Sequence, residues 1–172
     1  MSNLVIRAAT EADIGAITAI YAHAVRFGTA SFEIEPPDEA EMARRLGNLA
    51  GFPYLIAELD GRVRGYAYAG PYRTRVAYRY TLEDSIYIAP EFHRRGIGRV
   101  LLDRLITLSA ERGFRQMVAV IGDSAQVASI ALHRAAGFRM VGTLEAVGHK
   151  FDRWLDTVLM QRPIGDQRTD DT

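Results

Sequence analysis

The residues most informative about chemistry form a short turn, 93–98, that follows a strand-like run. Such a turn opens a helix and leaves the backbone N–H groups of the first helical turn unpaired. The helix dipole adds positive potential there, and so do Arg94 and Arg95. Because Gly96 and Gly98 carry no Cβ, an anion can approach the main chain closely. The turn therefore predicts a pyrophosphate site, although two glycines that merely ease helix entry would leave the same pattern.

Two common phosphate-binding loops do not fit this turn. It has no Gly-Lys-Ser/Thr ending, which excludes a P-loop, and Leu101 stands where a dinucleotide-binding loop has its third glycine. The turn instead resembles the acetyl-CoA loop of the GCN5-related N-acetyltransferases (GNAT), which reads Gln/Arg-x-x-Gly-x-Gly/Ala. His93 departs from that pattern at its first position. The departure affects only one side-chain contact to the cosubstrate, because backbone groups of the loop make most of the contacts to the diphosphate.

The second candidate for chemistry is Glu83, which lies just upstream of the turn. Alternation along a strand places Leu82, Ile86 and Ile88 on one face and places Glu83 on the other face. Three hydroxyl-bearing residues share that second face: Thr81, Ser85 and Tyr87. Amine acetylation needs a base for the proton of the amine, and a partly buried carboxylate with a raised pKa can supply it. The alternative is a solvated charge on a half-exposed strand.

The segment from Arg75 to Tyr87 resembles the phosphinothricin and methionine sulfoximine acetyltransferase branch of the GNAT superfamily. In that branch the glutamate of Thr-x-Glu-x-Ser/Thr-x-Tyr is the proposed general base, and it falls on Glu83. The resemblance also implies that the backbone of residues 86–88 pairs with the pantetheine arm of acetyl-CoA like an added strand. Relatives in this branch form homodimers, which the resemblance implies for this chain too.

A third signature is the segment from Gln126 to Phe138, which resembles the Asn-x-x-Ser-x-x-Leu-His/Tyr-x-x-x-Gly-Phe helix of the family. Gln126, Ser129 and His133 share one helical face. The resemblance implies that Ser129 binds the cosubstrate and that His133 protonates the leaving thiolate or hydrogen-bonds to it. A core histidine with both nitrogens satisfied is the alternative. The cosubstrate-binding residues implied are Ile86, Tyr87, Ile88, His93, Arg94, Arg95, Gly96, Ile97, Gly98, Arg99, Gln126 and Ser129.

The acceptor site is expected in the loops. Arg75 or Arg79 could clamp a carboxylate with two hydrogen bonds, and aromatic side chains could wall a small pocket. Without the resemblance, we would expect the arginine side chains to be solvated and the aromatic side chains to lie in the core. The resemblance points to the loop after the first helix and to the segment 147–154. The acceptor-binding candidates are Phe32, Arg75, Tyr78, Arg79, Thr81, Lys150 and Trp154.

Composition narrows the classes of function. The 172 residues contain 21 basic and 21 acidic side chains, so bulk charge favours neither nucleic acid nor a membrane surface as partner. The absence of cysteine excludes disulfides and thiolate catalysis. The four histidines are scattered along the chain, which argues against a metal site. With no apparent signal peptide or membrane-spanning run, we expect a cytoplasmic protein.

Periodicity predicts the elements that position these residues. We expect helices after Thr10 and from Asp38 to Leu49, and a hairpin around Asp60-Gly61. We expect a helix over 94–112 that ends at Gly113, and another that is capped by Asp123 or Ser124 and ends at Gly137. The predicted strands are 4–7, 54–58, 65–69, 78–88, 117–121, 138–144 and 151–160.

This order predicts an α+β fold with one central mixed sheet, mostly antiparallel, and helices on both faces. It matches the GNAT order over nearly the whole chain. We expect one domain over 1–163, followed by a polar, disordered tail over 164–172.

The sequence therefore predicts an acetyl-CoA-dependent N-acetyltransferase for the α-amine of a small amino-acid-like acceptor. Two alternatives remain open: an acetyltransferase for a protein N-terminus or lysine, and a non-catalytic acyl-CoA-binding sensor.

Overall fold

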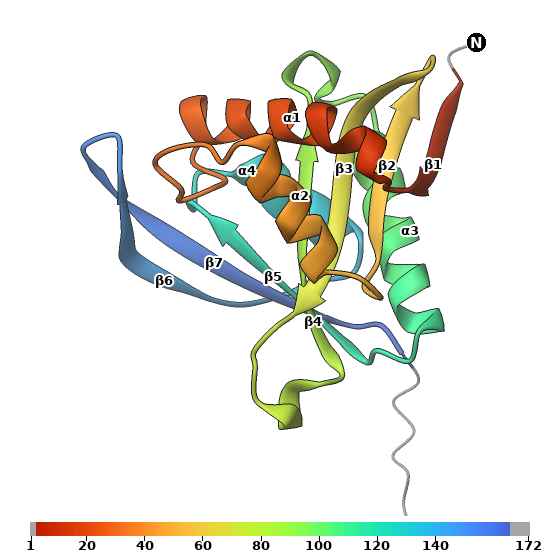
Figure 1. Cartoon of the computed structure of the whole chain (residues 1–172). Helices are drawn as coiled ribbons and strands as arrows, with labels where there is room; N and C mark the ends of the chain where they lie inside the picture. The colour runs from red at the N-terminus through yellow and green to blue at the C-terminus, as the bar shows by residue number, and fades with distance from the viewer. Residues whose placement is uncertain (1–2, 166–172) are drawn as a thin grey trace, which may run out of the picture.

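The computed structural model describes residues 3–165, in which seven strands form one sheet in the order β1-β2-β3-β4-β5-β7-β6 (Figure 1). Every neighbouring pair is antiparallel except β4 and β5. The strands are β1 (Leu4–Ala8), β2 (Tyr54–Leu59), β3 (Arg62–Pro71), β4 (Thr81–Ile88), β5 (Gln116–Gly122), β6 (Arg139–Lys150) and β7 (Arg153–Pro163). The α-helices are α1 (Ile14–Phe27), α2 (Glu39–Asn48), α3 (Ile97–Glu111) and α4 (Val127–Ala135), and short 3-10 turns lie at Glu11–Asp13, Val76–Tyr78 and Pro90–Phe92.

Both faces of the sheet are covered, as the sequence predicts. On one face, α3 buries an apolar stripe that includes Leu101 and Leu105, against Leu82 and Met117. On the other face, α1 and α2 cover the sheet, and Ile17 of α1 belongs to the same buried cluster as two sheet residues, Ile56 and Tyr66 (Figure 1). The central strands are therefore buried on both sides.

The hairpin between β2 and β3 is confirmed. Leu59 pairs with Arg62, and the two residues between them, Asp60 and Gly61, have positive φ angles of 51° and 74°. Positive φ at both central residues is the geometry of the tight turn that matches strand twist, which explains the Asp-Gly sequence.

The one parallel pair of strands separates partway along its length. β4 and β5 are in register from Thr81↔Gln116 to Asp84↔Ala119, and no further. β4 stays paired with β3 as far as Ile88, and β5 stays paired with β7 as far as Gly122. The facing edges beyond Asp84 and Ala119 therefore have main-chain groups that are not used in the sheet.

Several predicted boundaries are wrong. β6 runs to Lys150 and not to residue 144, and β3 begins at Arg62 and not at residue 65. β4 begins at Thr81, because residues 76–78 form a 3-10 turn. α3 begins at Ile97, because Arg94 and Gly96 have positive φ and belong to a loop. α4 begins at Val127 with Gln126 as its N-cap, and neither Asp123 nor Ser124 caps it. Asp123 itself has a φ of 69°, and its side chain is used elsewhere. Most of the predicted tail, residues 166–172, lies outside the described residues.

Candidate active site

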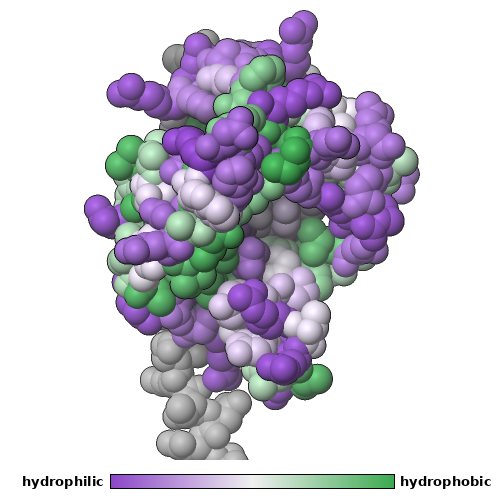
Figure 2. All heavy atoms as spheres, turned by 90° about the vertical axis from the view of Figure 1, so that its left-hand side faces the viewer, coloured by the Kyte–Doolittle hydropathy of each residue, from purple (hydrophilic) through white to green (hydrophobic). Residues whose placement is uncertain are grey.

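The space between the separating strands is the candidate active-site cleft. It is lined by β4, β5 and α4 and by Ala30 of the loop after α1. Its narrow end lies at Asp84 and Ala119, where the strands part, and its wide end lies toward the glycine turn that follows β4. Figure 2 views this side of the molecule and shows a hollow with polar and apolar atoms around it. The lining residues are Ala30, Asp84, Ser85, Ile86, Tyr87, Ala119, Val120, Ile121, Gly122, Gln126, Ser129 and His133.

The predicted glycine turn lies at the start of α3. Gly96 is the N-cap residue with φ of 80°, a left-handed conformation that favours glycine. It brings no side chain to cap the first N–H groups of the helix, and no other atom lies within 4 Å of where its Cβ would be. These features leave open space above unpaired N–H groups, as anion binding requires.

His93 of the turn and Arg99 of α3 have hydrogen-bond partners within the chain. The Nε2 atom of His93 lies 2.9 Å from the carbonyl oxygen of Ile88, so this ring turns back to the end of β4. Arg99 donates from Nε to Asp103 (2.6 Å) and from Nη1 to the carbonyl of Ala135 (3.0 Å), which ties α3 to the end of α4. Both side chains stabilise the walls of the site.

Glu83 lies on the face of β4 that α1 and α2 cover. Its side chain is 35% exposed, and its Oε2 atom lies 4.0 Å from Nη1 of Arg73. Burial raises the pKa of Glu83, the charge of Arg73 opposes this, and the neighbouring charge of Asp84 adds to it. A carboxylate with a raised pKa and partial access to solvent has the properties of a general base.

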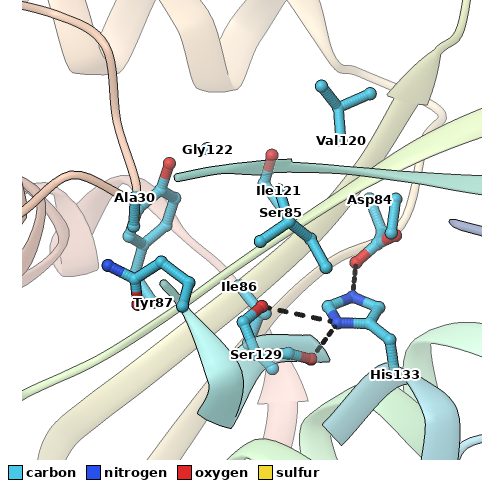
Figure 3. Close-up of a pocket in the computed structure, with 12 residues that line it drawn as sticks. Ala30, Asp84, Ser85, Ile86, Tyr87, Val120, Ile121, Gly122, Ser129 and His133 are labelled. Carbon is cyan, nitrogen blue, oxygen red and sulfur yellow. Dashed lines mark hydrogen bonds and ion pairs between the residues drawn. The ribbon is translucent and has the colours of Figure 1, made fainter. Parts of the chain in front are cut away.

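His133 lies in the cleft wall, and both of its nitrogens have partners (Figure 3). Nδ1 lies 2.8 Å from the carbonyl oxygen of Ser129, and Nε2 lies 2.9 Å from Oδ2 of Asp84. Because a carbonyl oxygen only accepts, Nδ1 carries a hydrogen. Burial lowers the pKa of His133, but the hydrogen bond and charge of Asp84 outweigh this, and the net shift is upward. This placement resembles the alternative of a core histidine with satisfied nitrogens.

Asp84 is the functional candidate that the sequence analysis missed. Its side chain is 1% exposed, and Oδ2 bonds to His133. Its other oxygen, Oδ1, is buried and finds no hydrogen-bond partner within the described part of the chain. A signal for it exists in the sequence: alternation puts this carboxylate on the apolar face, between Leu82 and Ile86. A buried carboxylate needs a partner, but only the fold identifies that partner as His133.

The loop after α1 is fixed to the cleft by buried polar contacts. Thr29 donates to Oδ2 of Asp123 (2.6 Å) and accepts from Nε2 of Gln126 (3.0 Å). Lys150 is 3% exposed, and its Nζ donates to the carbonyls of Gly28 (2.9 Å) and Ser31 (2.8 Å). Burial lowers the pKa of Lys150, and the charge of Glu33 opposes this shift. The cleft therefore has a rigid wall on this side.

The predicted acceptor residues are dispersed, and none of them lines the cleft. The ring of Phe32 packs against Gly122 and Gly148, where any Cβ would clash with it. Trp154 is 68% exposed and contacts the ring of His149 at a centroid distance of 4.8 Å. Thr81 is half-buried at the start of β4, and Lys150 is buried as described above. Exposed positions on the loop between β3 and β4 hold Arg75, Tyr78 and Arg79.

A second cavity, of about 250 Å³, lies between α2 and the β2–β3 strands, on the face that carries Glu83. Tyr68 lines it and pairs in register with Ser85, the second residue after Glu83 on β4. The remaining lining residues are Tyr21, Met42, Arg45, Asn48, Leu49, Tyr54 and Tyr66.

Comparison with known proteins identifies the family. The profile of the Acetyltransferase (GNAT) family matches residues 17–138, and the chain belongs to this family of acetyltransferases. The chain is similar to a phosphinothricin N-acetyltransferase of Alcaligenes faecalis (55% identity over 92% of this chain and 82% of the relative). It is also similar to an L-methionine sulfoximine/L-methionine sulfone acetyltransferase of Salmonella typhimurium (39% identity over 98% of this chain and 99% of the relative).

A solved structure with the same fold is that of a GNAT superfamily phosphinothricin acetyltransferase from Sinorhizobium meliloti in complex with AcCoA. Its TM-score is 0.93 at 46% identity, over 98% of this chain and 95% of that chain. The predicted family, branch, fold and enzyme class are thereby confirmed. In the described residues, no group of His, Asp and Glu could hold a metal ion, and no helix is long and apolar enough to cross a membrane.

Proposed function

We propose that the chain transfers an acetyl group from acetyl-CoA to the α-amino group of a small amino-acid-like acceptor, such as phosphinothricin or methionine sulfoximine. The observation that carries this proposal is the cleft between β4 and β5, which begins at Asp84, next to Glu83. The relatives act on acceptors of this kind, and one solved relative contains AcCoA.

The cleft fits the cosubstrate. The main-chain edges at which β4 and β5 no longer pair with each other, 85–88 and 120–122, offer hydrogen bonds to the amides of a pantetheine arm, as an added strand would. The glycine turn at the wide end offers N–H groups and arginines to the diphosphate. Ser129 and Gln126 line the α4 side. The binding roles of these residues rest on this fit.

Glu83 is the proposed general base. Acetyl-CoA supplies an activated acyl group, and the attacking amine must be neutral and must lose a proton as the C–N bond forms. Glu83 takes that proton, directly or through a water molecule, and its raised pKa suits it to the task. A backbone N–H on the open edge of β4 polarises the acyl carbonyl. Because both nitrogens of His133 are engaged, its role as acid for the thiolate stays a prediction.

The acceptor approaches from the face of Glu83. The rigid loop wall held by Lys150 and the cavity beside Tyr68 border that approach. The seven acceptor-binding residues predicted from the sequence stay predictions.

A homodimer and a cytoplasmic location are also proposals. β6 is the last strand of the sheet and exposes Val141, Leu144 and Val147 by 50%, 50% and 56%, and an apolar surface of this kind is typical of an interface. Light scattering on the purified protein tests the dimer: a monomer mass at micromolar concentration would contradict it.

The experiment that tests the function is a thiol-release assay with acetyl-CoA and a panel of amino acids, including phosphinothricin, methionine sulfoximine and methionine sulfone. We expect release that depends on one or more of these acceptors. Intact-mass analysis of added peptides forms the second arm. Acetylation of peptides without any amino-acid turnover would assign the enzyme to proteins, and binding of acetyl-CoA without turnover in either arm would make it a sensor.

A further inference from the structure

The buried Asp84 carboxylate at the narrow end of the cleft has a free hydrogen-bonding position that the proposed mechanism does not use. Oδ2 is held by Nε2 of His133 at 2.9 Å, and His133 is itself fixed by the carbonyl of Ser129 at 2.8 Å (Figure 3). The carboxylate cannot turn without breaking this chain of contacts. Its second oxygen, Oδ1, is buried and has no hydrogen-bond partner among residues 3–165.

An unpaired buried oxygen is costly, because it has lost its water and gained no donor. Asp84 lines the cleft, and no other side chain of the cleft offers Oδ1 a hydrogen. An occupant of the narrow end that carries a donor would therefore gain a hydrogen bond there, whereas an occupant without a donor would leave the oxygen unpaired.

The direction of the cleft decides which part of the occupant arrives at Asp84. If the glycine turn holds the diphosphate at the wide end, the pantetheine arm runs toward the narrow end, and its sulfur comes last. The amide N–H groups of the arm have main-chain partners along the open edges, 85–88 and 120–122. The sulfur has no such partner. In free CoA it carries a hydrogen, a weak donor, and in acetyl-CoA it carries none.

We propose that Asp84, held in place by His133, binds the thiol of CoA at the end of the cleft and so favours the thiol product over the thioester substrate. This inference rests on the proposed function. Asp84 is then a cosubstrate-binding residue that sets how strongly the product competes with acetyl-CoA, and His133 is a positioning residue that acts through it.

The test compares the wild type with a variant and CoA with two analogues. Calorimetry measures the Kd of each pair in the absence of an acceptor, so that no reaction takes place. Binding of CoA, acetyl-CoA and desulfo-CoA, which lacks the sulfur, is measured for the wild type and for Asp84→Ala. A hydrogen bond to a carboxylate predicts that the wild type binds CoA at least about 5-fold tighter than desulfo-CoA. In Asp84→Ala we expect this ratio to fall below about 2-fold, because the acceptor is gone.

Ser129→Ala is the matched control, because Ser129 also lines the cleft and contacts His133 through its carbonyl, which the change retains. We expect it to weaken CoA and desulfo-CoA by equal factors. Where Asp84→Ala does not fold, Asp84→Ala combined with His133→Leu removes both partners of the pair and leaves no unpaired imidazole. It is expected to show the same loss of ratio.

Three results would overturn the inference: equal affinities of CoA and desulfo-CoA for the wild type, an unchanged ratio in Asp84→Ala, or a larger loss of the ratio in Ser129→Ala. The failure of the proposed function looks different. In that case the thiol-release assay shows no turnover with any amino acid, or none of the three ligands binds the wild type.

Discussion

The two faces of β4 carry one carboxylate each, at consecutive positions, and their surroundings are opposite. Glu83 faces α1 and α2, keeps 35% of its side chain exposed and has the guanidinium of Arg73 at 4.0 Å. Asp84 faces the α3 and α4 side, is 1% exposed and bonds to His133. The strand places them one residue apart in sequence and on different sides of the sheet.

This difference shows how one strand supports two chemistries. A partly buried carboxylate without a strong partner keeps a raised pKa and can exchange protons with a substrate. A buried carboxylate fixed by a histidine is part of the scaffold and offers only its remaining oxygen to a ligand. The two positions should therefore respond to substitution in opposite ways.

The largest expected effect is the loss of catalysis in Glu83→Gln. A general base contributes about 10²- to 10⁴-fold to a rate, so we expect kcat to fall by about 10²-fold or more, with the Kd for acetyl-CoA unchanged. Steady-state kinetics at saturating acceptor and calorimetry measure the two quantities. A kcat within about 3-fold of the wild type across the pH range would remove Glu83 from the chemistry.

The free energy of unfolding should respond in the reverse order, with the larger loss at Asp84 and the smaller loss at Glu83. Removing one partner of a buried ion pair costs about 3–5 kcal/mol, so Asp84→Ala should lower the free energy of unfolding by about that amount. Glu83→Ala, at a half-exposed position, should change it by about 1 kcal/mol or less. Urea unfolding followed by circular dichroism compares the two variants. Equal losses would mean that the two faces of β4 do not differ as described.

The pH dependence of that stability follows from the raised pKa of His133. A group whose folded pKa is raised contributes stability that is complete below its unfolded pKa, which for histidine is about 6.5. The contribution is lost as pH rises through the folded pKa. We therefore expect the stability difference between the wild type and Asp84→Ala to narrow as pH is raised above neutral.

A smaller effect is expected from substitution of Lys150, which fixes the loop after α1 beside the proposed approach of the acceptor. Lys150→Met keeps a side chain of similar length but leaves two buried carbonyls, of Gly28 and Ser31, without their donor. We expect a loss of stability of about 1–3 kcal/mol and a rise in KM for the acceptor that exceeds any fall in kcat. Measurement of both kinetic constants decides this, and a change in kcat alone would contradict a positioning role.

The smallest effect concerns the pH profile of the reaction. Glu83 must be ionised to act as a base, so kcat/KM should fall as pH drops through its raised pKa, above the usual 4.5 of glutamate. Arg73 holds that pKa down, and Arg73→Ala should therefore move the acidic limb to higher pH. Arg44→Ala is the control, because Arg44 pairs with Glu41 on α2. An acidic limb at the same pH in Arg73→Ala and Arg44→Ala would exclude this electrostatic coupling.

Much of the fold could be predicted from local patterns. Asp60-Gly61 specifies the β2–β3 hairpin because both residues tolerate positive φ, and the spacing of Leu101 and Leu105 specifies the buried stripe of α3. The boundaries that failed depend on loops. Arg94 and Gly96 adopt positive φ angles. The carboxylate of Asp123 accepts a hydrogen bond from Thr29 and does not cap α4. Competing partners of this kind do not show in a local pattern.

The candidate site was predicted in part, for a similar reason. Glu83 and the glycine turn were predicted from neighbouring residues. The structure places Glu83 next to Asp84, which lines the cleft, and places the turn after the end of β4, and the roles of both stay predictions. The acceptor residues depend on contacts between distant loops, and the structure does not gather them at the cleft.

The sequence by itself determined that Glu83 and Asp84 face opposite sides of a strand and that a turn suited to an anion follows that strand. It did so because strand alternation and glycine conformations are local properties of the backbone. Only the tertiary structure decided that Asp84 meets His133 across 49 positions and that Lys150 reaches Gly28 across 122. Those contacts depend on how α4 packs against the sheet and on how β6 joins the sheet through β7, and this arrangement is a property of the whole chain.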